Sequence, residues 1–485
     1  MGASKHVVII GAGVGGLAAA LAFGRSGHRV TVLERDPLPP TADAEEAFLA
    51  ERRGAPQVHQ THGFLARIAV ELREHFPDVL DDLRAAGCTT MPTTANLGEP
   101  RPGDEDLSVL IVRRTTFEWV LRRAVVAEPT VAFRTGVAVE GLVAGHEAGP
   151  GGVPVVTGVR LDDGTTIAGD VVVASTGRRG AVPGWLAELG VDVPETTVES
   201  GLMYLSRWYR LPGEVDLGLD PKLGGDLGYV KYLGVPGDGD TLSITLAVRT
   251  EDGELRSALS DPDCFEYACR ILPGPDHFFR NGPLEPVGSV RPMTGLVNRI
   301  RRFVDDRGEP TVLGFHALGD AHTCTNPLYG RGCSLALVQA VLLAGAVAEH
   351  PDDPAGCAAA YEAACAREVE PWYEISLQMD RMGADPVGFG DLGPASGDRG
   401  EAAVGAKAMA AVFAAAATDP VIGRAMSRFW NLLALPADLA NDAELLGRVA
   451  AVMADPDSHP SPPREGPSRS ELLAALATKE TAAHA

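Results

Sequence analysis

The sequence predicts an α/β fold, in which a parallel sheet covered by helices is interrupted by an inserted mixed β-sheet domain and followed by a helical C-terminal region. Three observations predict it. Residues 6–34 read as strand, glycine-rich turn, helix and strand in immediate succession. Residues 202–249 hold longer strands with alternating side chains, which indicate a different sheet. Residues 355–450 are mainly helical in pattern.

The composition excludes several classes of function. Lys and Arg number 42 against 65 Asp and Glu, so the formal net charge is −23. Such a chain repels nucleic acid and anionic membranes, and we expect neither as a partner. The seven cysteines form no CxxC pair, which indicates a reduced, cytoplasmic compartment and no metal site. The N-terminus reads as a strand rather than a signal peptide, and no apolar stretch predicts stable membrane insertion.

The first part of the chain forms a complete βαβ unit. The continuous apolar run His6–Ile10 is typical of a central parallel strand. Gly-Ala-Gly-Val-Gly-Gly follows at 11–16 and opens the helix Leu17–Ser26, and the strand Arg29–Leu33 completes the unit. A glycine fingerprint in this context indicates a Rossmann-like nucleotide-binding domain.

The fingerprint gives each of its glycines a role. Gly11 permits the tight turn, Gly13 lets backbone approach a pyrophosphate, and Gly16 allows close packing of helix on strand. The N-terminus of the helix then offers N–H groups to the phosphates. Glu34 ends the second strand, where its carboxylate can accept from both ribose hydroxyls and disfavours a 2′-phosphate. We therefore expect a ligand with an adenosine diphosphate moiety.

A second, distant segment distinguishes FAD from NAD. The strand Thr311–Leu318 leads to Asp320, and a Pro/Gly loop at 326–332 opens the apolar helix Ser334–Glu349. Asp320 can bind a hydroxyl of a ribityl chain, and a turn or cap aspartate is the alternative. The helix N-terminus can stabilise negative charge on a reduced flavin, and the loop glycines let a planar ring lie against backbone. These features predict FAD.

The remaining pattern divides the chain into domains. Arg113–Val126 reads as an amphipathic helix, and helices are also expected near 62–74 and 77–86. Strands are expected at 131–140, 155–161, 166–174, 202–211, 228–235 and 241–249. We expect an FAD-binding domain of residues 1–75, 107–185 and 290–350, a substrate-binding domain of residues 76–106 and 186–289, a helical C-terminal region over 351–454, and a linker with a terminal helix over 455–485.

Four segments together resemble FAD-dependent monooxygenases of the para-hydroxybenzoate hydroxylase type. They are GAGVGGLAAALAFGRSGHRVTVLERD, VRRTTFEWVLRRA, GDVVVASTGRRG and LGDAHTCTNPLYGRGCSLALVQA, which span most of residues 5–350. RRGAPQVHQTHGFLAR and STGRRGAVPGWLAELG are most similar to the flavin epoxidases that act on polyene polyketides, and to squalene epoxidase. The resemblance implies an FAD-binding domain of the glutathione-reductase type.

The resemblance also implies a set of cofactor contacts. Arg114 opens the family's R-x-x-F-E pattern, and a surface arginine at a helix start is its alternative reading. Ala174 and Ser175 stand where the family often has Asp, which puts a nicotinamide contact there in doubt. Because no second glycine fingerprint follows in a strand–turn–helix context, NAD(P)H would bind transiently or a partner reductase would supply electrons. The residues expected to bind FAD are Gly11, Gly13, Gly16, Glu34, Arg35, Arg114, Val137, Thr176, Gly177, Asp320, Pro327, Gly330 and Gly332.

The chemistry that the resemblance implies belongs largely to the cofactor. In such enzymes reduced flavin reacts with O2 to a C4a-hydroperoxide, which transfers its distal oxygen to the substrate. His59 and His62 are candidates for lining the flavin or assisting proton transfer, and a polar helix start capped by Thr61 is the alternative. Tyr329 and Arg331 lie in the loop at 326–332 and are candidates for shaping the oxygen site.

The inserted sheet supplies the candidate substrate residues Met203, Tyr204, Tyr229 and Tyr232. Strand alternation places them towards either the flavin or the ordinary core. Because this region has no basic cluster, we expect an apolar small-molecule substrate of secondary metabolism. Hydroxylation and epoxidation remain open.

Three functions other than oxygen insertion are possible for this type of scaffold. Flavin halogenases need a lysine in the N-terminal half and a WxWxIP motif, but this chain has no Lys between Lys5 and Lys222 and no WxW. A reductase of the geranylgeranyl-reductase type shares the scaffold and remains the alternative. The intact glycine turn, Glu34 and Asp320 argue against a non-catalytic flavoprotein.

Overall fold

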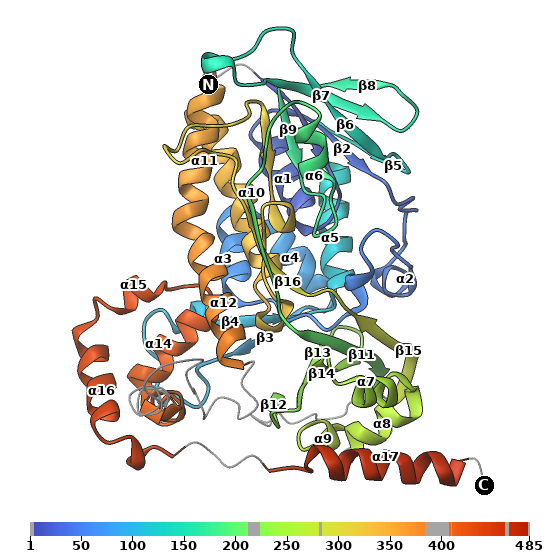
Figure 1. The fold of residues 1–485 in the computed structure, drawn as a ribbon, viewed down its shortest axis with the longest axis vertical. Helices are drawn as coiled ribbons and strands as arrows, with labels where there is room; N and C mark the ends of the chain where they lie inside the picture. Colours follow the sequence, from blue (N-terminus) through green and yellow to red (C-terminus); the bar gives the residue numbers. More distant parts are fainter. Residues whose placement is uncertain are drawn as a thin grey trace.

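The structure is a computed structural model that describes residues 4–211, 224–280, 284–383, 407–408, 410–460 and 465–483. It contains two main sheets, one above the other along the long axis of the molecule (Figure 1). The first is the predicted parallel sheet, with every strand pair parallel. Its strands, in spatial order, are β17 (Phe315–Ala317), β9 (Val171–Ala174), β1 (His6–Ile10), β2 (Arg29–Glu34) and β5 (Val131–Thr135).

Helices cover one face of the parallel sheet. Helix α1 follows the glycine turn and packs against the long apolar helix α10, and α1 is almost entirely buried. The shared apolar core also takes in α4, whose Val79 and Leu83 are fully buried in it, although the sequence assigned α4 to the substrate-binding domain. The helices on this side are α1 (Val14–Arg25), α2 (Ala44–Leu49), α3 (Ala66–His75), α4 (Pro77–Ala85), α5 (Arg114–Ala127), α10 (Gly332–Glu349) and α11 (Pro354–Glu368).

A small antiparallel sheet and α6 (Val182–Ala187) cover the opposite face. Two strands that the sequence predicted as continuous are each divided in two. The segment 131–140 breaks at Gly136, where φ is +68°, and 166–174 breaks so that its first half pairs with the small sheet and its second half with the parallel sheet. The small sheet consists of β6 (Val139–Ala144), β7 (Val156–Leu161) and β8 (Thr166–Ala168).

The inserted sheet is antiparallel in every strand pair that the described residues form, where the sequence analysis expected a mixed sheet. The reason is local: β13 and β14 are joined by a short hairpin at 238–240, and such a connection requires antiparallel neighbours. In spatial order the strands are β12 (Gly224–Asp226), β13 (Val230–Gly237), β14 (Thr241–Arg249), β11 (Leu202–Arg210) and β15 (Glu285–Met293).

Helices cover the outer face of this sheet, and the last helix of the chain lies along them (Figure 1). Leu472 and Leu476 of α17 are buried in the same core as the sheet. The terminal helix therefore returns to the inserted domain after the long C-terminal excursion. These helices are α7 (Gly253–Ser260), α8 (Pro262–Ile271), α9 (Pro275–Arg280) and α17 (Arg469–Ala483).

Smaller elements join the two domains. A second small sheet contains β10 (Glu195–Glu199), β16 (Val297–Arg301) and β18 (Thr323–Cys324), and a two-stranded ribbon is formed by β3 (Thr89–Pro92) and β4 (Ser108–Ile111). The C-terminal region is helical where it is described, and 384–406 of the predicted helical stretch lies outside the described residues. Its helices are α12 (Glu370–Gly383), α14 (Pro420–Trp430), α15 (Pro436–Leu439) and α16 (Ala443–Ala454).

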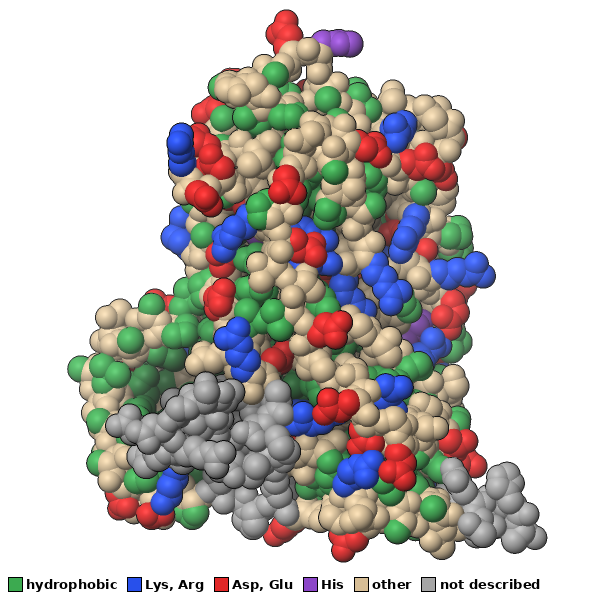
Figure 2. Space-filling model, viewed as in Figure 1, with side chains coloured by type: hydrophobic (Ala, Val, Ile, Leu, Met, Phe, Trp, Pro, Cys, Tyr) green, Lys and Arg blue, Asp and Glu red, His purple; other side chains and the backbone are tan. Residues whose placement is uncertain are grey.

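One helix among the described residues, α10, is long and apolar enough to cross a membrane. It lies within the fold, however, with 61% of the tested window buried, as a core helix does. Acidic and basic side chains are interspersed over the face of the molecule shown in Figure 2. The fold class expected from the sequence, a Rossmann-like α/β domain with an inserted sheet and a helical C-terminal region, is confirmed, while the domain boundaries remain a prediction.

Candidate functional site

The glycine turn has the shape that its sequence predicts. Gly11 adopts φ +102°, and a Cβ there would lie 2.4 Å from the carbonyl oxygen of Ser175. A Cβ on Gly16 would lie 1.9 Å from the carbonyl oxygen of Gly11. A Cβ on Gly13, by contrast, meets no atom within 4 Å. Gly11 and Gly16 thus serve the turn itself, and Gly13 faces open space in front of the uncapped N-terminus of α1.

Glu34 ends β2 beside this turn, and its side chain is nearly buried. Its Oε2 accepts from the N–H of Ala12 at 2.9 Å, and its Oε1 accepts from the N–H of Asp36 at 2.9 Å. The N–H of Val137 donates to the carbonyl oxygen of Glu34 at 3.0 Å. Arg35 is exposed and donates to the carbonyl oxygen of Gly54. Glu34 and Val137 therefore lie together, and Arg35 extends towards the neighbouring loop.

A chain of buried charges extends from Glu34, and the sequence analysis did not identify its middle members. Arg52 Nη2 donates to Glu34 Oε2 at 3.1 Å, and Arg52 Nη1 donates to Glu118 Oε2. Arg114 Nε donates to Glu118 Oε1 at 2.9 Å. Burial raises the pKa of Glu118, but Arg114 and Arg52 lower it more, so the net shift is downwards and the carboxylate stays charged. The i, i+4 spacing of Arg114 and Glu118 is the one signal of this chain visible in the sequence.

A cavity of about 50 Å³ lies beside these charges. Its wall combines the glycine turn with the carboxylate–arginine chain, so open space reaches both elements expected at the adenosine end of a dinucleotide. The lining includes Ala12, Leu17, Arg52, Glu118 and Trp119.

His62 is the last residue in this chain of contacts, and its imidazole ring is neutral. Arg114 Nη1 donates to His62 Nε2 at 2.9 Å, and His62 Nδ1 donates to the carbonyl oxygen of Gln60 at 2.9 Å. Burial and the adjacent Arg114 guanidinium lower the pKa of His62 to about 3. The ring therefore accepts a hydrogen bond from Arg114, an environment that does not favour proton transfer near neutral pH.

The residues around His59 join the two domains instead of starting a helix. Helix α3 begins at Ala66, so the alternative of a cap by Thr61 is wrong. Thr61 Oγ1 bonds the hydroxyls of Ser243 and Thr245 on β14. The carbonyl oxygen of His59 accepts from the indole N–H of Trp208 at 2.8 Å, while its Nε2 bonds the carbonyl oxygen of Ala50.

A buried ion pair fixes the start of α5, which carries Arg114. Asp238, at the tip of the β13–β14 hairpin, accepts from the backbone N–H and from Nη2 of Arg113, both at 2.7 Å. It also accepts from Thr116 Oγ1 at 2.7 Å. The side chains of Arg113 and Asp238 are 2% and 1% exposed. The inserted sheet thus positions the helix that presents Arg114, a link that spacing in the sequence does not reveal.

Asp320 lies where the sequence analysis placed it, in a 3-10 turn directly after β17. A Cβ on Gly332 would lie 3.9 Å from Asp320 Oδ1, so the carboxylate faces the start of α10. Burial raises the pKa of Asp320, while the charges of Arg114, Arg178 and Arg299 act in the opposite direction. A carboxylate surrounded by cations at a helix start suits an acceptor for hydroxyl groups.

Two buried hydroxyl groups near these turns have no partner among the described residues. They are Thr176 Oγ1, in the loop after β9, and Ser334 Oγ, in the first turn of α10. Gly177 follows with φ +68°. A buried hydroxyl without a partner costs free energy, and a bound polar ligand would relieve that cost.

The loop at 326–332, hereafter the flavin loop, is a short 3-10 turn, Pro327–Tyr329, that ends at Gly330 in a left-handed conformation (φ +66°). The Tyr329 hydroxyl donates to Asp380 Oδ1 of α12 at 2.7 Å. Arg331 is fully buried and donates to Ser376 Oγ at 2.7 Å, also on α12. Both side chains therefore point to α12, and their packing favours a structural role.

The four candidate substrate residues lie on both faces of the inserted sheet. Tyr204 faces the flavin loop, and its hydroxyl donates to Asn326 Oδ1 at 2.7 Å. Met203 and Tyr232 belong to the core under α7–α9, and Tyr229 donates to the carbonyl oxygen of Pro467. Three of the four candidate residues therefore pack in or against the ordinary core, and of the four only Tyr204 approaches the flavin loop.

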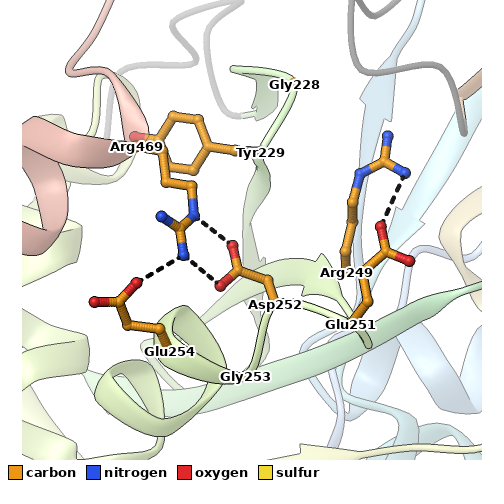
Figure 3. Close-up of a pocket in the computed structure, with 8 residues that line it drawn as sticks. All are labelled: Gly228, Tyr229, Arg249, Glu251, Asp252, Gly253, Glu254 and Arg469. Atoms are coloured by element: carbon orange, nitrogen blue, oxygen red, sulfur yellow. Dashed lines mark hydrogen bonds and ion pairs between the residues drawn. The ribbon is translucent and has the colours of Figure 1, made fainter.

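A surface cavity of about 410 Å³ lies beside α7 and α17, and of the four candidate substrate residues only Tyr229 lines it. Arg469 of α17 forms ion pairs there with Asp252 and Glu254 (Figure 3). These ion pairs hold the terminal helix against the inserted domain, and the cavity shares no residue with the glycine turn or the flavin loop.

The residues present fit an FAD molecule. Open space in front of Gly13, the uncapped N-termini of α1 and α10, and the carboxylates of Glu34 and Asp320 provide the donors and acceptors that a dinucleotide requires. Thr176 and Ser334 add two unpartnered hydroxyls.

Comparisons with known proteins bear on the fold that carries these residues. Residues 6–101 match the family "FAD dependent oxidoreductase". Protein Rv3254 of Mycobacterium tuberculosis is 27% identical over 363 residues, which cover 69% of this chain and 71% of the relative. The structure is similar to p-nitrophenol 4-monooxygenase PnpA of Pseudomonas putida (TM-score 0.59, 18% identity, 89% of this chain and 99% of the other). It is also similar to the flavin-dependent brominase Bmp2 (TM-score 0.60, 17% identity, 93% and 100%). Residues 6–101 therefore resemble an FAD-dependent oxidoreductase domain, and the chain shares the fold of these two flavin-dependent enzymes.

Proposed function

We propose that this protein is an FAD-dependent monooxygenase that inserts one oxygen atom from O2 into an apolar organic substrate. The observation that carries the proposal is an apolar cluster at the flavin loop. Tyr204, Ala247 and Leu296 are buried together, and Leu328 of the flavin loop packs against them. An apolar wall beside the expected position of the ring excludes water, which protects a reactive oxygen species from discharge.

The chain's own residues have defined parts in this proposal. The N-terminus of α1 would hold the pyrophosphate, Glu34 the ribose and Asp320 the ribityl chain. The N-terminus of α10 carries no acidic residue in its first turn and would stabilise negative charge on the nearest edge of the reduced ring. The bound cofactor supplies the activation of O2. The protein orients the substrate and keeps the site dry.

Electrons would come from NAD(P)H that binds transiently, or from a partner reductase. The glycine fingerprint at 11–16 directly follows a continuous apolar run, as a Rossmann-like unit requires, and it is assigned to FAD. The acidic chain and the seven free cysteines are consistent with a cytoplasmic enzyme of secondary metabolism.

The test is product identification after reconstitution with FAD. The purified protein is supplied with NADH, NADPH or a flavin reductase, and is offered a panel of polyenes and phenols in air and under nitrogen. We expect an oxygenated product in air only. A hydrogenated product under nitrogen would instead establish a reductase of the geranylgeranyl-reductase type.

The similarity to a brominase calls for one further arm with added bromide. We expect no halogenated product, because the N-terminal half of the sequence is poor in lysine and the sequence has no WxW motif. A brominated phenol in that arm would overturn the assignment.

A further inference from the structure

The carboxylate of Asp380, near the end of α12, collects three side-chain donors at the flavin loop. Tyr329 Oη and Asn326 Nδ2 donate to its Oδ1 at 2.7 and 2.8 Å. Asn298 Nδ2 donates to its Oδ2 at 2.6 Å. Two of these donors belong to the flavin loop, and the third is on β16. No motif in the sequence singles out Asp380 or Asn298.

The surrounding contacts require an acceptor at both oxygens of Asp380. Asn298 Oδ1 accepts from the backbone N–H of Asn326 at 2.8 Å, so the Asn298 amide cannot turn over without losing that bond. Asn326 Oδ1 accepts from the Tyr204 hydroxyl and from the N–H of Leu328, so the Asn326 amide is fixed as well. An amide at position 380 would therefore set its NH2 group against a donor.

The negative charge of Asp380 matters because Arg331 nearby carries a buried positive charge. Its guanidinium is fully buried and bonds the neutral acceptors Ser376 Oγ and the carbonyl oxygen of Trp372. Burial lowers the pKa of Arg331 to about 10, and the charge of Asp380 acts against that shift. Among the described residues Arg331 forms no salt bridge, so Asp380 is the carboxylate that offsets its charge.

We propose that Asp380 is a positioning residue that holds the flavin loop in the shape that receives the ring, and that Tyr204 transmits the position of the inserted sheet to the same loop through Asn326. The inference rests on the proposed function, in which the flavin loop contacts FAD. It adds that affinity for the cofactor depends on a helix outside the FAD-binding domain and on a tyrosine of the sheet that would carry the substrate.

The experiment measures FAD binding to the apo-protein by calorimetry, together with the visible absorption spectrum of the bound flavin. We compare wild type with Asp380→Asn, Tyr329→Phe and Tyr204→Phe. Glu374→Gln is the matched control, because Glu374 is exposed on the same helix. We expect Asp380→Asn to bind FAD about tenfold or more weakly and to shift the flavin absorption bands, since a charged buried hydrogen bond is lost. Tyr329→Phe and Tyr204→Phe should also weaken FAD binding, but by a smaller factor.

The outcomes separate the two proposals. If wild type binds no FAD, the proposed function fails. If wild type binds FAD and Asp380→Asn binds it equally well with an unchanged spectrum, the present inference is overturned and the proposed function stands. Should Asp380→Asn not fold, the two Tyr→Phe variants decide, because each removes one hydroxyl and keeps the ring. Wild-type affinity and spectrum in both of them would then refute the inference.

Discussion

The two ends of the candidate site are stabilised in different ways. At the adenosine end, Glu34, Arg52 and Glu118 form consecutive charge pairs within the N-terminal part of the chain. At the flavin end, neutral amide and phenol donors from β16 and the flavin loop surround the single carboxylate of Asp380, which lies on α12. The charge pairs of the first end lie within one predicted domain, although Asp238 of the inserted sheet fixes the start of the helix that carries Glu118. The contacts of the second end join the flavin loop to β16 and to the C-terminal helix α12.

The largest effect is expected from breaking the charge pairs at the adenosine end. Arg52→Met leaves the carboxylates of Glu34 and Glu118, each 7% exposed, with one partner fewer. Removing one member of a buried ion pair costs about 3–5 kcal/mol of unfolding free energy. Urea unfolding of the apo-protein measures it, with the exposed Arg53→Met as the control. Equal stability of the two variants would show that the charge pairs contribute little.

Substitutions at two glycines of the turn should separate an effect on stability from an effect on cofactor binding. Gly16→Ala places a methyl group 1.9 Å from a backbone oxygen, so we expect a loss of about 1–3 kcal/mol in stability. Gly13→Ala meets no protein atom within 4 Å, so its melting temperature without FAD should match wild type, while FAD affinity falls because the methyl group occupies the space in front of α1. Thermal melts and FAD titrations of both variants test this. A Gly13→Ala protein that binds FAD normally would refute the assignment of the pyrophosphate.

How much of each end can be predicted from the sequence depends on how close its contacting residues lie along the chain. The role of Gly16 depends on Gly11, a neighbour along the chain, and the fingerprint predicts it well, whereas the carbonyl oxygen that approaches Gly11 belongs to the distant Ser175. Arg52 and Asp380 act on residues far away in the sequence, so no spacing identifies them. Strand alternation shows that Tyr204 and Met203 lie on opposite faces, but only the packing of α7–α9 on one face shows which of them is in the core.

His62, which accepts from Arg114 at the end of the charge chain, gives the smallest expected effect. Its pKa is about 3 in the folded protein and near 6.5 when unfolded, so the unfolded chain binds more protons between these values and stability falls as the pH falls. From about pH 7 to about pH 5.5 this contributes roughly 1 kcal/mol of lost stability. His62→Asn, which can still accept from Arg114, should lose less stability over that range.

Urea unfolding at both pH values measures this difference, with the exposed His146→Asn as the control for the substitution itself. A His62→Asn protein with the pH dependence of wild type would contradict the neutral state of the ring.

The most direct test of oxygen insertion is the source of the oxygen atom in the product. The FAD-loaded enzyme is reduced under nitrogen in the presence of a substrate from the polyene and phenol panel, and is then mixed with ¹⁸O₂ in ordinary water. The proposed function predicts that one ¹⁸O atom appears in the product by mass spectrometry. A product that takes its oxygen from water, or a reduced flavin that never consumes O2 with any substrate, would contradict it.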